Sequence, residues 1–157
     1  MYVLQVVSGK EKEILNRLLD LGFKCLVPEG FRYRRTKGAW QGLSEIIFKG
    51  YVFVSMTWSA ENYYKITSVE GVIRLLRADS TPLQLTFLEE EWIVVLDSLG
   101  AKPTTVELID DKCFIKDGVL SKFETSIVKV DKHKRCALIE IMVLGETHKI
   151  ELGIDIV

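Results

Sequence analysis

Basic and aromatic side chains alternate between residues 29 and 43, a pattern suited to binding nucleic acid. Guanidinium and ammonium groups hold phosphates, and aromatic rings stack on bases. The competing interpretation is a solvated hairpin whose charges keep the protein soluble. Glycines at positions 30, 38 and 42 favour a hairpin or a mobile loop here. The candidate phosphate contacts are Arg32, Arg34, Arg35 and Lys37, and the accompanying rings are Phe31, Tyr33 and Trp40.

A second basic cluster lies on a predicted strand and turn near the end of the sequence. Its members are Lys129, Lys132, His133, Lys134 and Arg135. The net charge of the chain is only −1, so a polyanion meets two local patches rather than a uniformly basic protein. This cluster is suited to a structured RNA, and the alternative is again a solvated hairpin tip.

The strongest strand signal, Glu45–Met56, carries aromatic residues on both sides of a glycine. A glycine inside such a run bends the strand or admits a close backbone approach. Phe48 and Tyr51 therefore lie on either side of a bend at Gly50. Each ring belongs either to the core or to an exposed aromatic groove, and the pattern alone leaves both alternatives open.

Residues that usually perform catalysis or bind metals are scattered along the chain. His133 and His148 have no partner at the spacing of a catalytic triad or a metal site, and no glycine-rich phosphate loop is present. Cys25, Cys113 and Cys136 are odd in number and widely spaced, which fits neither a disulfide framework nor a zinc site. We therefore expect reduced thiols, no enzyme activity, no metal and no cofactor.

Composition places the chain among ordinary globular proteins. Its 157 residues are 48% apolar and 27% charged, which allows one medium domain or two small ones. No apolar run is long enough to span a membrane, and the first residues lack the basic leader of a signal peptide. We expect a cytoplasmic protein with no membrane association.

The first hundred residues predict alternating strands and helices. A helix opens at Ser8 with Glu11 at capping-box spacing, and another opens at Ser59 or Thr57 with Tyr63, Tyr64 and Ile66 on its buried side. The whole order is an α+β, ferredoxin-like split βαβ arrangement. The predicted strands are Tyr2–Val7, Phe23–Val27, Glu45–Met56 and Gly71–Leu76, and the predicted helices are Ser8–Leu21, Ser59–Ser68 and Phe87–Leu99.

The rest of the chain predicts a small all-β barrel after a linker. Residues 101–105 lack periodicity and contain turn formers, so we expect domains at 1–100 and 106–157. Short strands separated by turns are typical of a small barrel. These strands are Cys113–Lys116, Ser126–Asp131, Ala137–Val143, Thr147–Leu152 and Ile154–Val157.

Several segments, taken in order, resemble NusG-type transcription elongation factors, which join an N-terminal NGN domain to a KOW barrel. The resemblance covers nearly the whole chain, and its ordered set of motifs is more specific than any one of them. In the N-terminal part the matching segments are Tyr2–Leu4, Ser8–Glu11, Leu26–Glu29, Phe48–Val54, Val69–Val72 and Pro82–Leu85 before Glu91. In the C-terminal part they are Ile115–Gly118, Glu124, Ile127–Asp131 and Ile150–Val157.

The chain departs from the family pattern at several positions. Met1 stands where the family usually has tryptophan, and Lys49 stands where it has proline. In the KOW segment, Val119, Lys122 and Thr125 occupy the usual later proline and glycine positions. These departures, with the short linker, indicate a specialised paralogue resembling operon-restricted antiterminators such as RfaH or LoaP.

The resemblance implies a monomeric factor that binds the clamp helices of bacterial RNA polymerase and suppresses pausing or termination. The basic clusters, joined by Lys122, would then contact a nascent RNA hairpin or the non-template DNA, with RNA and DNA both left open. The alternative function is a free-standing RNA-binding module of ribosomal or translational type. The polymerase contacts implied by the resemblance are Tyr2, Phe48, Lys49, Gly50 and Tyr51.

Overall fold

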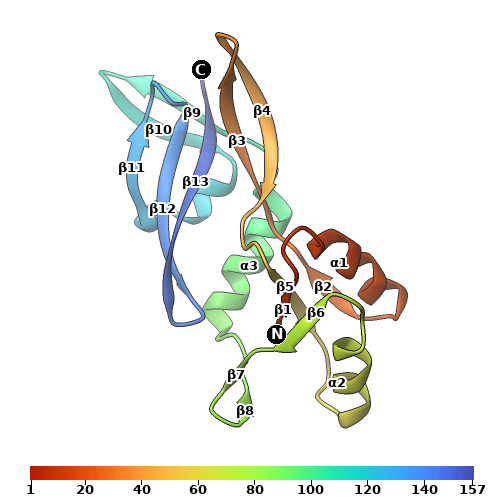
Figure 1. Ribbon diagram of the computed structural model, residues 1–157. Coiled ribbons are helices and arrows are strands. Elements are labelled where there is room, and N and C mark those ends of the chain that lie inside the picture. The colour runs from red at the N-terminus through yellow and green to blue at the C-terminus, as the bar shows by residue number, and fades with distance from the viewer. The chain divides into compact units, whose positions relative to one another are not determined.

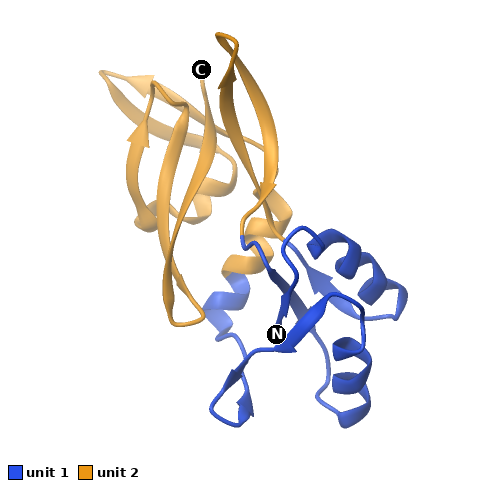
Figure 2. Cartoon of the chain, in the orientation of Figure 1, with its two compact units in different colours: residues 1–27, 48–91 blue, residues 28–47, 92–157 orange.

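The computed structural model describes all residues from 1 to 157, and its contacts divide the chain into two compact units. Unit 1 consists of Met1–Val27 and Phe48–Glu91, and unit 2 consists of Pro28–Ile47 and Trp92–Val157 (Figure 2). The basic hairpin of the first half therefore belongs to the same unit as the strands of the second half. The division into domains at residues 101–105 stays a prediction.

Unit 1 is built on a four-stranded antiparallel sheet in the order β2-β5-β1-β6 (Figure 1). This is the order of a ferredoxin-like split βαβ sheet, so the predicted α+β fold class is confirmed. Val3, Leu4 and Phe53 are fully buried in it. The strands are β1 (Tyr2–Val6), β2 (Lys24–Leu26), β5 (Tyr51–Ser55) and β6 (Val72–Leu75), with helices α1 (Glu11–Asp20) and α2 (Ala60–Thr67).

Helix α2 begins at a residue that satisfies a free backbone N–H group, whereas the cap of α1 differs from the prediction. Ser59 caps α2, because its hydroxyl accepts a hydrogen bond from the Asn62 backbone at 3.0 Å, as predicted. Ser8 does not cap α1: the cap position is Lys10, without a side-chain bond, and Glu11 instead accepts from the Gly9 N–H.

Helix α3 (Phe87–Leu99) matches its predicted bounds, beginning in unit 1 and ending in unit 2. Its first turn holds a reciprocal capping box that was not predicted. The Thr86 hydroxyl accepts from the Glu89 N–H at 3.2 Å, and the Glu89 carboxylate accepts from the Thr86 N–H at 2.8 Å. A short hairpin before it, β7 (Arg77–Ala78) with β8 (Thr81–Pro82), was not predicted either.

Unit 2 contains a five-stranded sheet in the order β10-β9-β13-β12-β11, with only the β9–β13 pair parallel. Residues of both edge strands, among them Ile115 and Ile127, line one hollow of about 480 Å³, so the sheet curls toward a barrel. The strands are β9 (Thr104–Ile109), β10 (Lys112–Asp117), β11 (Ile127–Asp131), β12 (Cys136–Val143) and β13 (Glu146–Ile156), with short 3-10 turns at Val119–Lys122 and Glu124–Ser126.

Two predictions of strands and one prediction of burial were wrong. The stretch Glu45–Met56 is not one strand: its first two residues end β4 (Ala39–Ile46), and a turn precedes β5. The last two predicted strands are a single strand, β13, because Gly153 continues the pairing with β12. Tyr64 is 73% exposed instead of buried, whereas Ile66 is buried as predicted.

The predicted linker is partly strand. Thr104 and Thr105 open β9, where they pair with Ile154 and Asp155 of β13. Thr104 is fully buried, and its hydroxyl accepts a hydrogen bond from the Leu120 N–H at 3.2 Å. A polar residue satisfied in this way is typical of packed structure rather than of a free connection. In addition, no helix of the chain is both long and apolar enough to cross a membrane.

Candidate nucleic-acid interface and aromatic pocket

The basic segment at residues 29–46 is an ordered antiparallel hairpin of β3 (Glu29–Thr36) and β4. Lys37 and Gly38 form its two-residue turn, and both have positive φ, 52° and 79°. This is the geometry of the primed turns that match strand twist. By strand alternation, the rings of Phe31, Tyr33 and Trp40 lie on one face of the hairpin.

The aromatic face of the hairpin packs on β13 within unit 2. The Phe31 ring fills the space left by two glycines: a Cβ on Gly153 would lie 2.8 Å from it, and one on Gly42 only 2.5 Å. The Tyr33 hydroxyl forms a hydrogen bond with the Asp155 carboxylate. Burial, together with this bond and the negative charge of Asp155, raises the pKa of Tyr33, and nearby Arg135 opposes the shift.

One ion pair also connects the hairpin to the sheet, and two more lie within the hairpin. Arg32 contacts Glu45 of its own hairpin at 3.4 Å and Glu151 of β13 at 3.1 Å. Arg34 contacts Glu45 at 3.2 Å. These pairs are partly exposed, so each contributes little to stability, but they neutralise two of the four hairpin cations.

The second basic cluster is held by a tight turn between β11 and β12. The Asp131 carboxylate accepts a hydrogen bond from the Lys134 backbone N–H at 3.0 Å, and this bond lowers the pKa of Asp131. Arg135 has a φ of 52°, and its carbonyl accepts from the Ile154 N–H at 3.0 Å. The turn is therefore fixed against β13, beside the hairpin.

The structure brings the two basic clusters together around Trp40. The Arg135 guanidinium lies 5.8 Å from the Trp40 ring centroid and 5.7 Å from that of Tyr33. The Arg35 guanidinium lies 5.9 Å from Trp40. These are cation–π distances, and they connect residues of both clusters to one indole.

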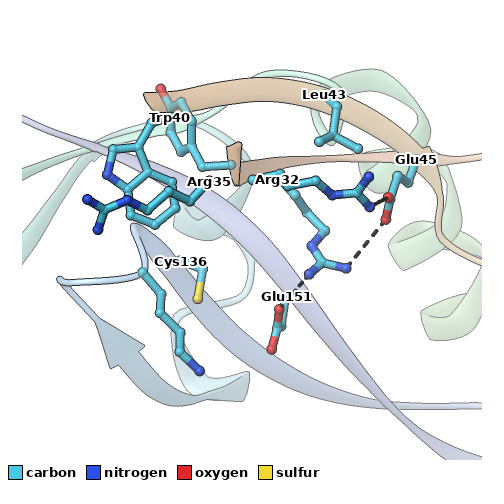
Figure 3. A pocket seen from close by; sticks show the side chains of 10 residues that line it. Arg32, Arg35, Trp40, Leu43, Glu45, Cys136 and Glu151 are labelled. Atoms are coloured by element: carbon cyan, nitrogen blue, oxygen red, sulfur yellow. Dashed lines mark hydrogen bonds and ion pairs between the residues drawn. The ribbon is translucent and has the colours of Figure 1, made fainter. Parts of the chain in front are cut away.

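A pocket of about 380 Å³ lies at this junction (Figure 3). Figure 3 shows Trp40 at one end and the ion pairs of Arg32 with Glu45 and Glu151 at the other. Burial, followed by the charges of Glu151 and Asp131, raises the pKa of the Cys136 thiol in its wall. The complete lining is Arg32, Tyr33, Arg34, Arg35, Trp40, Leu43, Glu45, Lys134, Cys136 and Glu151.

The remaining predicted nucleic-acid contacts lie outside this pocket. Lys37 is exposed at the hairpin tip, and Lys122 is exposed on a 3-10 turn. Lys132 forms an ion pair with Asp111 at 3.0 Å. Lys129 and His133, which are close to Lys132 in sequence, are exposed. The predicted set is thus one convergent group and several separate surface cations.

Unit 1 has a pocket of its own, of about 350 Å³, at the bend of Gly50. Gly50 has a φ of +83°, and its carbonyl accepts from the Val6 N–H at 2.8 Å. The predicted bend with a close backbone approach is therefore present. The pocket rim is apolar and open, since Val7 is 42% and Ile73 57% exposed. Its lining is Gln5, Val6, Val7, Ser8, Lys49, Gly50, Tyr51 and Ile73.

Only part of the predicted aromatic site surrounds this pocket. Phe48 is 3% exposed and packs edge-on against Phe53 with centroids 5.4 Å apart, so the core alternative holds for this ring. Tyr2 pairs with Val54, three residues beyond Tyr51 along β5, so strand alternation places Tyr2 on the opposite face of the sheet. There it packs against Trp58 at 5.5 Å.

Sequence reasoning missed the apolar rim of the unit 1 pocket and two lining residues of the unit 2 pocket, Cys136 and Glu151. Ile73 and Val7 read as ordinary strand residues, and only the β1–β6 pairing puts them beside Tyr51. Cys136 on β12 and Glu151 on β13 belong to paired strands, and both are far from the hairpin in sequence. No local signal marks these residues, because their positions depend on long-range strand register. No group of three or more metal-ligating side chains is present in the chain.

Comparison with known proteins identifies relatives over almost the full length. Residues 1–94 match the family model described as transcription termination factor nusG. The transcription termination/antitermination protein NusG of Halalkalibacterium halodurans is 25% identical, over 96% of this chain and 93% of that protein. The same protein of Bacillus subtilis is 23% identical, over 96% and 93%.

A solved structure has a similar fold. It is described as domain interaction in Thermotoga maritima NusG, and it covers 98% of this chain and 92% of its own with a TM-score of 0.53. At 19% identity this likeness concerns the fold alone. The family match, in contrast, spans more than half of the chain.

Proposed function

This chain belongs to the NusG family of transcription termination and antitermination factors, which are not enzymes, and from that premise we propose that it binds RNA polymerase during elongation. In this proposal unit 1 contacts the clamp helices of bacterial RNA polymerase and suppresses pausing or termination. Unit 2 contacts nucleic acid through its basic clusters. The protein acts as a monomer in the cytoplasm.

The pocket at Gly50 is the observation that carries the polymerase proposal. It combines an exposed apolar rim, Val7 and Ile73, with the half-buried ring of Tyr51 and the exposed cation of Lys49. An open apolar groove with an aromatic anchor is the usual receptor for one face of an amphipathic helix. Phe48 and Tyr2 then support the sheet beneath this surface rather than touching the helix.

The departures from the family pattern support a specialised role. Lys49 replaces the usual proline directly beside Gly50, so the polymerase contact carries an extra charge at its rim. We therefore place the chain among operon-restricted antiterminators rather than general elongation factors. Its nucleic-acid signal is a nascent RNA hairpin or the non-template DNA strand, held by the hairpin cations and by Lys122, Lys129, Lys132, His133, Lys134 and Arg135.

A second candidate function is an RNA-binding module of ribosomal or translational type that acts without polymerase. The observation that favours it is the convergence of Arg35 and Arg135 on Trp40 inside unit 2, with Lys134 in the wall of the same pocket. Such a module needs only unit 2. The two functions differ in whether unit 1 contributes to binding.

The deciding experiment is a pull-down of bacterial core RNA polymerase by the intact protein and by Tyr51→Ala, at two salt concentrations. We expect the intact protein to bind and Tyr51→Ala to bind at least about tenfold more weakly, because hot-spot aromatic residues commonly contribute 2 kcal/mol or more. Tyr64→Ala is the matched control, since this tyrosine of unit 1 is 73% exposed on α2 and outside the pocket. Equal binding by intact protein and Tyr51→Ala contradicts the proposal.

A further inference from the structure

The junction between the hairpin and β13 leaves a net excess of positive charge. Arg32 and Arg34 are occupied by Glu45 and Glu151, which lie at one end of the pocket. Arg35 and Arg135 lie over Trp40, Lys134 lines the same pocket, and none of these three cations forms an ion pair. Phosphates are therefore attracted to the Trp40 end and repelled from the carboxylates.

The same end offers a surface for stacking. Trp40 is half-buried, and its contacts are the exposed guanidinium groups of Arg35 and Arg135. A cation–π contact at the surface is weaker than the stacking of a base on an aromatic ring. A base can thus displace a guanidinium from the indole, and the released cation is then beside the phosphate of that nucleotide.

The volume and the wall chemistry suit one nucleotide. A pocket of about 380 Å³ is at the small end of the range for small-molecule sites. Its far wall presents the guanidinium of Arg32 and the carboxylates of Glu45 and Glu151, which are donors and acceptors for the edge of a base. A base inside a duplex cannot enter such a pocket, so the ligand must be unpaired.

We propose that the two basic clusters form a single composite site, created by docking of the hairpin on β12 and β13, that accepts one unpaired nucleotide of a single-stranded nucleic acid. The base enters the pocket against Trp40, and the flanking phosphates lie on Arg35, Lys134 and Arg135. The proposal deepens the nucleic-acid part of the proposed function and rests on it. It does not depend on the polymerase pocket of unit 1.

The first test measures binding of fluorescein-labelled single-stranded oligonucleotides of about 12 residues, RNA and DNA of the same mixed sequence, with the duplex as a third probe. We expect the single strands to bind and the duplex to bind at least about tenfold more weakly. Trp40→Ala should weaken single-strand binding about tenfold, and Trp40→Phe should restore most of it. The RNA and DNA arms decide which strand is preferred.

A double-mutant cycle tests whether the site is composite. Arg35 lies on the hairpin and Lys134 on the β11–β12 turn. Both residues are exposed, so neither Arg35→Ala nor Lys134→Ala should unfold the protein. If both cations hold one nucleotide, the losses in affinity are coupled and the double variant loses less than the product of the single losses. If the two cations act at independent sites, the double variant loses affinity by the full product of the two single losses, and this result overturns the proposal. Lys112→Ala, an exposed cation of unit 2 outside the pocket, is the charge-matched control.

A thiol footprint locates the ligand independently of affinity. Cys136 lines the pocket, whereas Cys113 is in the other hollow of unit 2 and is also partly exposed. We expect bound single-stranded oligonucleotide to slow maleimide labelling of Cys136 at least about fivefold and to leave Cys113 unchanged, because a nucleotide held through stacking excludes the reagent. Equal protection of both thiols, or of neither, contradicts the site.

Docking itself is tested by Gly153→Ala. The added methyl group meets the Phe31 ring and displaces the hairpin from β13, without removing any charge. We expect this variant to lose single-strand binding as severely as the Arg35→Ala/Lys134→Ala double variant. Unchanged binding shows that the clusters act separately. Polymerase pull-down and oligonucleotide binding by the intact protein separate the two proposals. Intact protein that binds polymerase but no single-stranded oligonucleotide rejects only the composite site.

Discussion

Single residues of this chain are placed by a few close contacts that local sequence does not reveal. Gly153 reads as a strand breaker but is the position at which the Phe31 ring meets the sheet. Tyr33 reads as an exposed ring but bonds to Asp155. Both contacts join the hairpin to β13, so the residues with the most specific roles in unit 2 are those at this junction.

The Tyr33 contact makes the stability of unit 2 depend on pH in the alkaline range. Burial and the bond to Asp155 raise the pKa of Tyr33 above its ordinary value of about 10. The folded state therefore holds the phenol proton more tightly, so this contribution is complete below pH 10 and is lost as the pH rises through the raised pKa.

Tyr33→Phe is expected to lower the free energy of unfolding by about 1 kcal/mol at pH 8 and to weaken its decline above pH 10. Urea titrations at pH 8, 10 and 11 measure both effects. Tyr64→Phe, at an exposed site of unit 1, is the control. An unchanged alkaline decline in Tyr33→Phe argues against this assignment.

Burial also determines the reactivity of Cys25. Its thiol is buried and its pKa is raised to about 11 by desolvation, so it stays protonated at pH 8. We expect Cys25 to react with a disulfide reagent at least about tenfold more slowly than Cys113, because only the thiolate attacks. Mass spectrometry of timed reactions at pH 8 identifies the modified residue. Labelling of Cys25 before Cys113 in the folded protein contradicts this prediction.

At the scale of elements, the chain shows which patterns suffice to predict local structure. Helices α2 and α3 and the hairpin turn were predictable, because Ser59, the acidic first turn of α3 and Gly38 act through their immediate neighbours. The cap of α1 was not predictable in this way, since Ser8 lies at the rim of the Gly50 pocket rather than at the helix end.

Helix α3 ends unfavourably, and this supplies an element-scale prediction. Its last turn holds Asp97 and no basic residue, although the helix dipole favours cations there. Burial and the charge of Glu29 raise the pKa of Asp97, so the folded state disfavours the charged carboxylate. Stability is therefore greatest below the ordinary carboxyl pKa and falls as the pH rises through the raised value.

Asp97→Asn should increase the free energy of unfolding by about 0.5 kcal/mol at pH 7, with the gain disappearing near pH 3. Thermal or urea denaturation at both pH values is the measurement. Asp20→Asn, at the end of α1, shows whether the effect is particular to α3. A gain that persists at pH 3 points to a cause other than charge.

At the scale of the whole molecule, the order of the elements was predictable but the partners of the hairpin were not. Periodicity and turn residues predicted the split βαβ sheet and the short strands after it, because each pattern is local. The packing of β3 on β13 brings together residues distant in sequence, and the convergence of the two basic clusters follows from that packing. Both clusters were predicted, but their union was not.

The division of the chain leads to a prediction about the fragment 1–100, the domain expected from the sequence. In this fragment the hairpin lacks β13, so its amide protons should exchange much faster than in the full chain. The amides of β1 and β5 should keep their protection, since their sheet partners lie within the fragment. Hydrogen exchange of fragment and full chain tests this directly, and equal protection of the hairpin in both shows that it folds with unit 1.

The contact between Tyr33 and Asp155 joins residues 122 positions apart. During synthesis on the ribosome, the sheet of unit 1 can form once residue 75 has emerged, while the hairpin between its strands waits for β13. Long-range pairing of this kind forms late, because a large loop must close first. The newly made chain therefore forms the unit 1 surface well before the composite site.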